Sequence, residues 1–244
     1  MKNKFISITI LIFSYQLVLT QKKGVEEFLK SNQDEIGTFY SVSEDLKNSN
    51  KVVHLFLINK DLKEIPVEIK KFKNLIELNV SNNKIKQIPC WIKDMQKLEK
   101  LEMRSNMMVN LPEFIFYLPK LTELIIWGNN IKSLPALNKG VSKLEVLDVS
   151  QNSLFDLSGS YENLSSLRDL RLDGNRFVII PQVVLKMKSL EYLHLLNNKI
   201  QGFNFASGNG SKLKQIELAF NPINKLKINE LKKILPKCNI TTSF

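Results

Sequence analysis

The sequence predicts an α/β fold in which short parallel strands repeat along the chain. An apolar residue opens a new unit every 23 residues, at Val52, Leu75, Leu98, Leu121, Leu144, Leu167, Leu190 and Leu213. The fourth and sixth positions of each unit are also apolar, as Leu78 and Val80 show for the second unit. Alternating apolar residues lie on one face of a strand, and a fixed period means that one unit stacks on copies of itself.

An asparagine column accompanies the strands. The ninth position is asparagine in every unit except the first, which has Lys60; the seven are Asn83, Asn106, Asn129, Asn152, Asn175, Asn198 and Asn221. An amide side chain both donates and accepts hydrogen bonds. Such a column can satisfy the backbone groups of a buried turn, each of which costs roughly 1–3 kcal/mol if it is left unpaired. We therefore expect a structural asparagine ladder.

Proline ends the strand region in most units. Five units have an apolar residue and proline at positions fourteen and fifteen, as in Ile88-Pro89, and the proline fixes φ and stops the strand. In the fifth, seventh and eighth units Ser158, Asn204 and Lys227 replace it. The rest of each unit has apolar residues at helix-like spacing, which predicts a return along the outer side. The seventh unit departs from this pattern, because Ser207 and Gly210 replace the outer apolar pair.

The repeat can be written LxxLxLxxNxLxxIPxxIxxLxx, and it resembles the leucine-rich repeat family in its 23-residue form. The resemblance covers residues 52 to about 235. It implies a right-handed solenoid of eight repeats between terminal caps, with a parallel sheet lining a concave face. Members of this family characteristically bind proteins on that face.

The rest of the chain divides around the repeats. Residues 1–20 carry Lys2 and Lys4 before an apolar run that is short and interrupted for a membrane span, which is typical of a secretory signal peptide. An uncleaved anchor is the alternative. Residues 21–51 are expected to form an N-terminal cap that includes Ser43 as a helix N-cap, in the manner of small bacterial secreted proteins of this type. The solenoid then occupies residues 52–235, and residues 236–244 form a tail after a capping helix. We expect a secreted, cell-surface or periplasmic protein without a membrane span in its mature form.

Charge argues against nucleic acid as the partner. The formal net charge is +11, but the strand positions that should face outward on the concave side hold ten acidic and five basic residues. The lysines must then be scattered over the exterior, whereas a nucleic-acid footprint clusters Lys and Arg on one face.

Trp127 is the residue that points most directly to binding. It follows Leu124 and Ile126 on the opposite side of the strand, so it cannot enter the core without exposing both. Exposed aromatics near arginine are typical of interface hot spots. We expect a protein partner on the concave face, bound by Trp127, Ile125, Arg104, Glu102, Asp148, Arg171, Tyr192, His194 and Leu196.

The sequence offers little for catalysis. Cys90 and Cys238 make neither a disulfide framework nor a zinc site, and there is no phosphate-binding glycine loop or zinc-protease motif. We expect no enzyme activity, no metal and no cofactor. Two other functions stay open: a surface adhesin that binds an anionic polymer or membrane through its basic exterior, and a hydrolase built on His194 and nearby acids.

Overall fold

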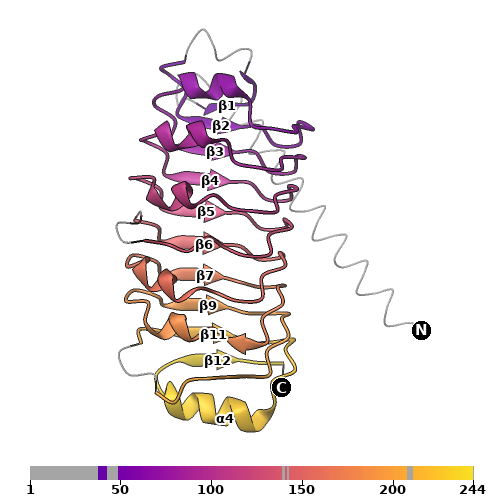
Figure 1. Ribbon diagram of the computed structural model, residues 1–244, viewed down its shortest axis with the longest axis vertical. Helices are drawn as coiled ribbons and strands as arrows, with labels where there is room; N and C mark the ends of the chain where they lie inside the picture. Colours follow the sequence, from indigo (N-terminus) through magenta and orange to yellow (C-terminus); the bar gives the residue numbers. More distant parts are fainter. Residues whose placement is uncertain (1–37, 43–48, 139–140, 142, 208–210, 244) are drawn as a thin grey trace, which may run out of the picture.

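The computed structural model describes residues 38–42, 49–138, 141, 143–207 and 211–243. Within these residues, ten strands form one parallel sheet, stacked one above the next (Figure 1). In sheet order they are β1 (Thr38–Phe39), β2 (His54–Phe56), β3 (Glu77–Asn79), β4 (Lys100–Glu102), β5 (Glu123–Ile125), β6 (Val146–Asp148), β7 (Asp169–Arg171), β9 (Tyr192–His194), β11 (Gln215–Glu217) and β12 (Asn239–Thr241). The parallel solenoid that the repeat predicts is therefore the fold of the chain.

The strands of the repeat pair without any shift in register. From β2 to β11 each begins 23 residues after the one before. Leu78, Leu101 and Leu124 are consequently direct neighbours across β3, β4 and β5, and all three are fully buried. In the other strands of the repeat, the buried column is continued by Leu55, Leu147, Leu170, Leu193 and, in β11, Ile216.

Each asparagine of the ninth position connects two turns. Asn106 shows the pattern: its Oδ1 accepts a hydrogen bond from the Ile85 N–H at 3.0 Å, and its Nδ2 donates to the Val80 carbonyl at 3.0 Å. The same two contacts, to residues 21 and 26 positions earlier, are made by the other six asparagines, Asn83, Asn129, Asn152, Asn175, Asn198 and Asn221. The side chains thus supply hydrogen bonds that the turns cannot make among themselves.

The residue before each asparagine position adopts a left-handed conformation. The values of φ lie between 49° and 69° at Asn59, Asn82, Ser105, Gly128, Gln151, Gly174, Asn197 and Phe220. Glycine and asparagine tolerate this region well, whereas other residues are strained in it. The turn geometry therefore prevails over local preference wherever a larger side chain occupies the position.

The outer side is built mainly from short 3₁₀ helices. These are η2 (Val67–Lys71), η3 (Cys90–Asp94), η4 (Glu113–Tyr117), η5 (Gly159–Asn163) and η6 (Gln182–Leu185). Proline is the N-cap of four of them, whereas Ser158 caps η5 by accepting a hydrogen bond from the Ser160 N–H. Just before the outer segment, β10 (Gly202–Phe203) of the seventh unit pairs in parallel with β8 (Ile179–Ile180) of the sixth.

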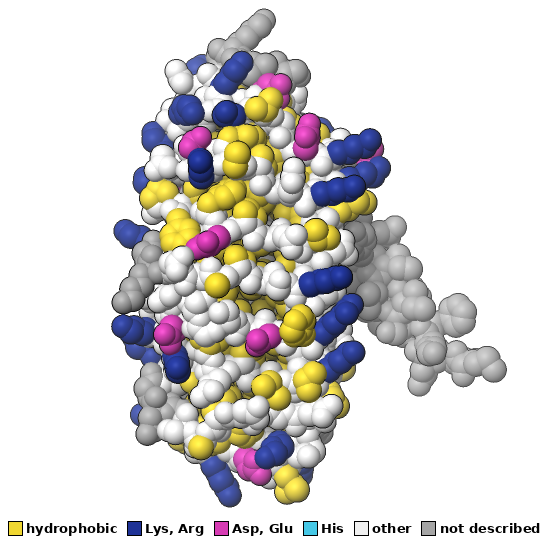
Figure 2. Space-filling view, in the orientation of Figure 1, with side chains coloured by type: hydrophobic (Ala, Val, Ile, Leu, Met, Phe, Trp, Pro, Cys, Tyr) yellow, Lys and Arg dark blue, Asp and Glu magenta, His cyan; other side chains and the backbone are white. Residues whose placement is uncertain are grey.

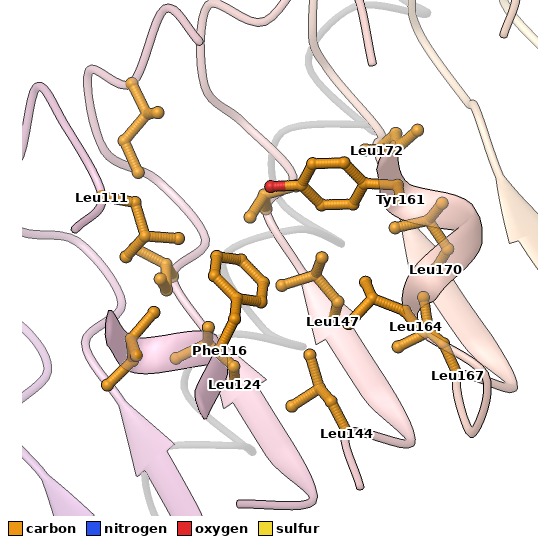
Figure 3. Close-up of a cluster of buried hydrophobic side chains, with 14 of the residues drawn as sticks. Leu111, Phe116, Leu124, Leu144, Leu147, Tyr161, Leu164, Leu167, Leu170 and Leu172 are labelled. Atoms are coloured by element: carbon orange, nitrogen blue, oxygen red, sulfur yellow. The ribbon is translucent and has the colours of Figure 1, made fainter. Parts of the chain in front are cut away.

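The core lies between the sheet and these outer segments. Figure 3 shows Phe116 of η4 and Tyr161 of η5 pointing toward each other among leucines from several units. Their ring centroids are 5.9 Å apart in an edge-to-face arrangement, and both side chains are fully buried.

A helix and a strand close the C-terminal end of the solenoid. The predicted signal peptide (1–20), the Ser43 cap and most of the 21–51 region lie outside the described residues. At the other end, α4 (Lys225–Ile234) follows Asn224, which caps it by accepting a hydrogen bond from the Lys227 N–H at 2.9 Å. The chain then forms β12, a strand beside β11 that the repeat does not predict. No helix among the described residues is long and apolar enough to cross a bilayer.

Candidate functional site

The face of the sheet turned away from the core, called the sheet face below, carries the third, fifth and seventh positions of each unit. Trp127 stands on it with 40% of its surface exposed, and Tyr192 with 38%. Leu124 and Ile126, the neighbours that would have to leave the core if the strand were reversed, are fully buried. The structure thus places Trp127 on the side of the strand that the alternation predicts.

Three residues of the predicted binding set are buried instead of open. Glu102, Ile125 and Asp148 are 7%, 6% and 9% exposed, and they are direct neighbours at the ends of β4, β5 and β6. Parallel strands lie about 4.8 Å apart, so side chains of adjacent strands cover one another. Asp148 also turns toward the backbone and accepts a hydrogen bond from the Ser150 N–H at 3.0 Å. The expectation that these three residues are exposed is wrong.

A first charged network surrounds Lys100. Its Nζ lies 2.8 Å from Glu102, 3.3 Å from Glu77 and 3.6 Å from Glu123. Burial acts to lower the pKa of Lys100, but the three carboxylates outweigh it and raise the pKa above its ordinary value. Arg104 adds a second cation, with its Nε 3.2 Å from Glu102. The network joins β3, β4 and β5 beside Trp127.

A second network surrounds His194. Its Nε2 lies 3.3 Å from Asp169 and its Nδ1 2.9 Å from Glu217, while Arg171 contacts Asp169 at 2.6 Å. The hydrogen bond to Asp169 raises the pKa of His194 to about 8, against the opposing effect of burial and with a further contribution from Glu217. The imidazole is therefore mostly protonated at neutral pH. This network joins β7, β9 and β11.

Apolar surface accompanies the second network. Tyr192 lies in register between Asp169 and Gln215. Leu196 is partly exposed, and its N–H donates to the Asp173 carboxylate at 2.7 Å. Each exposed aromatic of the sheet face thus lies close to one charged network.

Comparison with known proteins identifies the family of the repeat. Models of the leucine-rich repeat family match residues 119–177 and 74–95. The chain is a leucine-rich repeat protein. A search of curated proteins found no match to this sequence.

Two solved structures of leucine-rich repeat proteins are similar over most of the chain. The ectodomain of the plant membrane receptor kinase GASSHO1/SCHENGEN3 from Arabidopsis thaliana, in complex with CASPARIAN STRIP INTEGRITY FACTOR 2, is 27% identical with a TM-score of 0.63, over 84% of this chain and 26% of that one. An internalin from Listeria monocytogenes is 20% identical with a TM-score of 0.65, over 83% of this chain and 57% of that one. This leucine-rich repeat chain spans only part of either protein.

The geometry around His194 does not favour hydrolysis. Both ring nitrogens lie within 3.3 Å of a carboxylate oxygen, which leaves neither nitrogen free to take a proton from a nucleophile. Among the described residues, no group of three or more His, Cys, Asp or Glu side chains is placed to hold a metal ion.

The predicted binding set omitted the residues that organise the site. Lys100, Asp169 and Glu217 are the centres or anchors of the two networks. Their charges are visible in the sequence at the third and fifth positions of their units, and the 23-residue period places each of them on the strand next to its partner: Lys100 next to Glu77 and Glu123, and Asp169 and Glu217 on either side of His194. Pairing charges across neighbouring units would have found them.

Proposed function

We propose that this protein is a non-enzymatic, exported interaction module that binds a protein partner on its sheet face. The observation that carries the proposal is the exposure of two large aromatic side chains, Trp127 and Tyr192, on that face. Large aromatics with apolar area and a polar handle dominate interface energetics. The receptor ectodomain, a similar leucine-rich repeat structure, was solved in complex with CASPARIAN STRIP INTEGRITY FACTOR 2, which supports a binding role here.

The ion networks support recognition by fixing the surface around the aromatics. Lys100 and His194 each bridge carboxylates from different strands. Side chains held in this way lose little conformational entropy when a partner binds. Arg104, whose side chain is 44% exposed, stays available to an acidic group of the partner beside Trp127.

The test is a pull-down from the native source with mass spectrometry, using wild type, Trp127→Ala/Tyr192→Ala and a control. The control, Val67→Ala/Leu226→Ala, removes apolar side chains of 57% and 74% exposure away from the sheet face. We expect a partner that survives a high-salt wash on wild type and control and is lost from the sheet-face variant. Equal retention by all three folded proteins would refute binding at this face.

A further inference from the structure

A second surface of the solenoid is independent of the sheet face. The tenth and twelfth positions of the units follow the asparagine turns and lie along one border of the sheet, called the loop edge below. Of these sixteen positions, six are basic, one is acidic and five are apolar. Figure 2 shows dark blue side chains along the right-hand border of the molecule, with apolar side chains beside them. The basic residues are Lys63, Lys84, Lys86, Lys132, Arg176 and Lys199.

The positive charges of the loop edge are mostly unpaired. Lys84 lies 2.7 Å from Asp61, the one acidic residue of the set. The other five basic residues are exposed and have no ion-pair partner within the described parts of the chain. The sheet face is different, because Lys100, Arg104 and Arg171 are all paired there. The loop edge therefore carries cationic groups that are free to meet an anionic surface.

Apolar side chains stand among these charges. Phe155 is 65% exposed, Val109 51%, Val178 47% and Met107 43%. They come from the third, fifth and sixth units, and Lys132 of the fourth unit lies between them. Clustered apolar groups on a surface mark sites of interaction. Between Lys63 and Val178 the edge extends on the order of 24 Å, at the spacing of parallel strands.

We propose that the loop edge binds the surface of a lipid bilayer that contains anionic lipids. The apolar side chains enter the boundary between headgroups and acyl chains, and the lysines and arginine contact the headgroup phosphates. The aliphatic side chains favour a bilayer over nucleic acid, since Phe155 is the one aromatic residue among the sixteen positions and Val109, Val178 and Met107 offer no aromatic face for a base to stack on. A membrane uses both properties of the edge, whereas a soluble polyanion uses only its charge.

The first test separates this edge from the general basic charge of the protein. Binding is measured by sedimentation with vesicles of phosphatidylcholine, alone or with about one third phosphatidylglycerol. The variant Lys63→Glu/Lys86→Glu/Lys132→Glu changes the loop edge. The matched control, Lys120→Glu/Lys143→Glu/Lys212→Glu, makes the same charge change at exposed positions just before the strands. Each basic residue near an anionic surface contributes roughly fivefold to partitioning, so we expect a loss of roughly a hundredfold in the first variant and a much smaller one in the control.

The second test measures whether the apolar side chains of the loop edge insert into the bilayer. Phe155→Ser/Val178→Ser should weaken binding to the mixed vesicles by about tenfold or more without changing the net charge. Phe155→Trp should show blue-shifted emission on those vesicles that wild type, with Trp91 and Trp127 elsewhere, does not show. Circular dichroism confirms the fold of each variant.

Two results would overturn the proposal. Equal losses in the loop-edge and control charge variants would mean unspecific attraction. Unchanged binding in Phe155→Ser/Val178→Ser, together with no spectral change in Phe155→Trp, would leave only a polyanion surface. Neither result bears on the sheet-face variants, so this proposal and the proposed function can fail separately.

Discussion

At the scale of single residues, Tyr161 carries a defect inside an otherwise apolar core. Its side chain is fully buried, and its hydroxyl has no hydrogen-bond partner among the described residues. Burial also raises the pKa of Tyr161, since no group stabilises the phenolate. Tyr161→Phe removes the unpaired hydroxyl and keeps the ring that packs on Phe116, so we expect the free energy of unfolding to rise by about 1 kcal/mol. Denaturant unfolding measures the change. Tyr192→Phe, at an exposed ring, is the control and should change nothing; a destabilised Tyr161→Phe protein would reveal an unrecognised partner.

Phe220 is a second residue with a local cost. Its φ is 59°, and its ring is 73% exposed, so packing of the ring does not offset the strain of the left-handed conformation. Asparagine occupies the equivalent position at Asn59, Asn82 and Asn197. We expect Phe220→Asn to raise the free energy of unfolding by about 1 kcal/mol, whereas Leu226→Asn, in helix α4, should not. Thermal unfolding of both variants decides this, and a loss of stability in Phe220→Asn would show that the ring packs on something the structure does not describe.

At the scale of elements, His194 connects three strands through its charge. Its pKa in the folded protein is about 8, above the ordinary value of 6.5. A group whose pKa is raised on folding stabilises the protein fully below the unfolded value and loses that effect as pH rises through the folded value. We therefore expect the free energy of unfolding to fall by about 2 kcal/mol between pH 6 and pH 9 through this group. His194→Gln should lack this part of the pH dependence, which denaturant titrations at several pH values measure. Parallel pH profiles for the two proteins would contradict the assignment.

Some features of these elements could be predicted from the sequence, and others could not. The asparagine turns, the strand starts and the exposure of Trp127 depend only on period and alternation, which are local properties. The burial of Glu102 and Ile125 depends on the side chains of the neighbouring strands. Alternation within a single strand does not contain this information, and it wrongly predicts that both residues face solvent. The parallel pairing of β8 with β10, just before the outer segment, joins the sixth and seventh units, and neither the period nor the alternation of the sequence predicts it.

At the scale of the whole molecule, each unit contacts only its neighbours, so stability depends on how the ends are closed. Ile240 of β12 is 7% exposed and pairs with Ile216 of β11, whereas Thr241 is exposed. Ile240→Asp places a charge against the last leucines of the core, and we expect a loss of about 3 kcal/mol. Thr241→Asp, one residue further along the same strand, should be nearly neutral.

Amide hydrogen exchange measures which elements lose stability in the Ile240→Asp protein. In Ile240→Asp, protection should disappear first in β12, α4 and β11, because only nearest-neighbour contacts transmit the damage. Strands β3 to β5, which lie at the other end of the ladder (Figure 1), should keep theirs. Uniform loss of protection along the chain would mean that the solenoid unfolds as one cooperative unit, and the end strand would then stabilise the distant sheet face as well as its own neighbours.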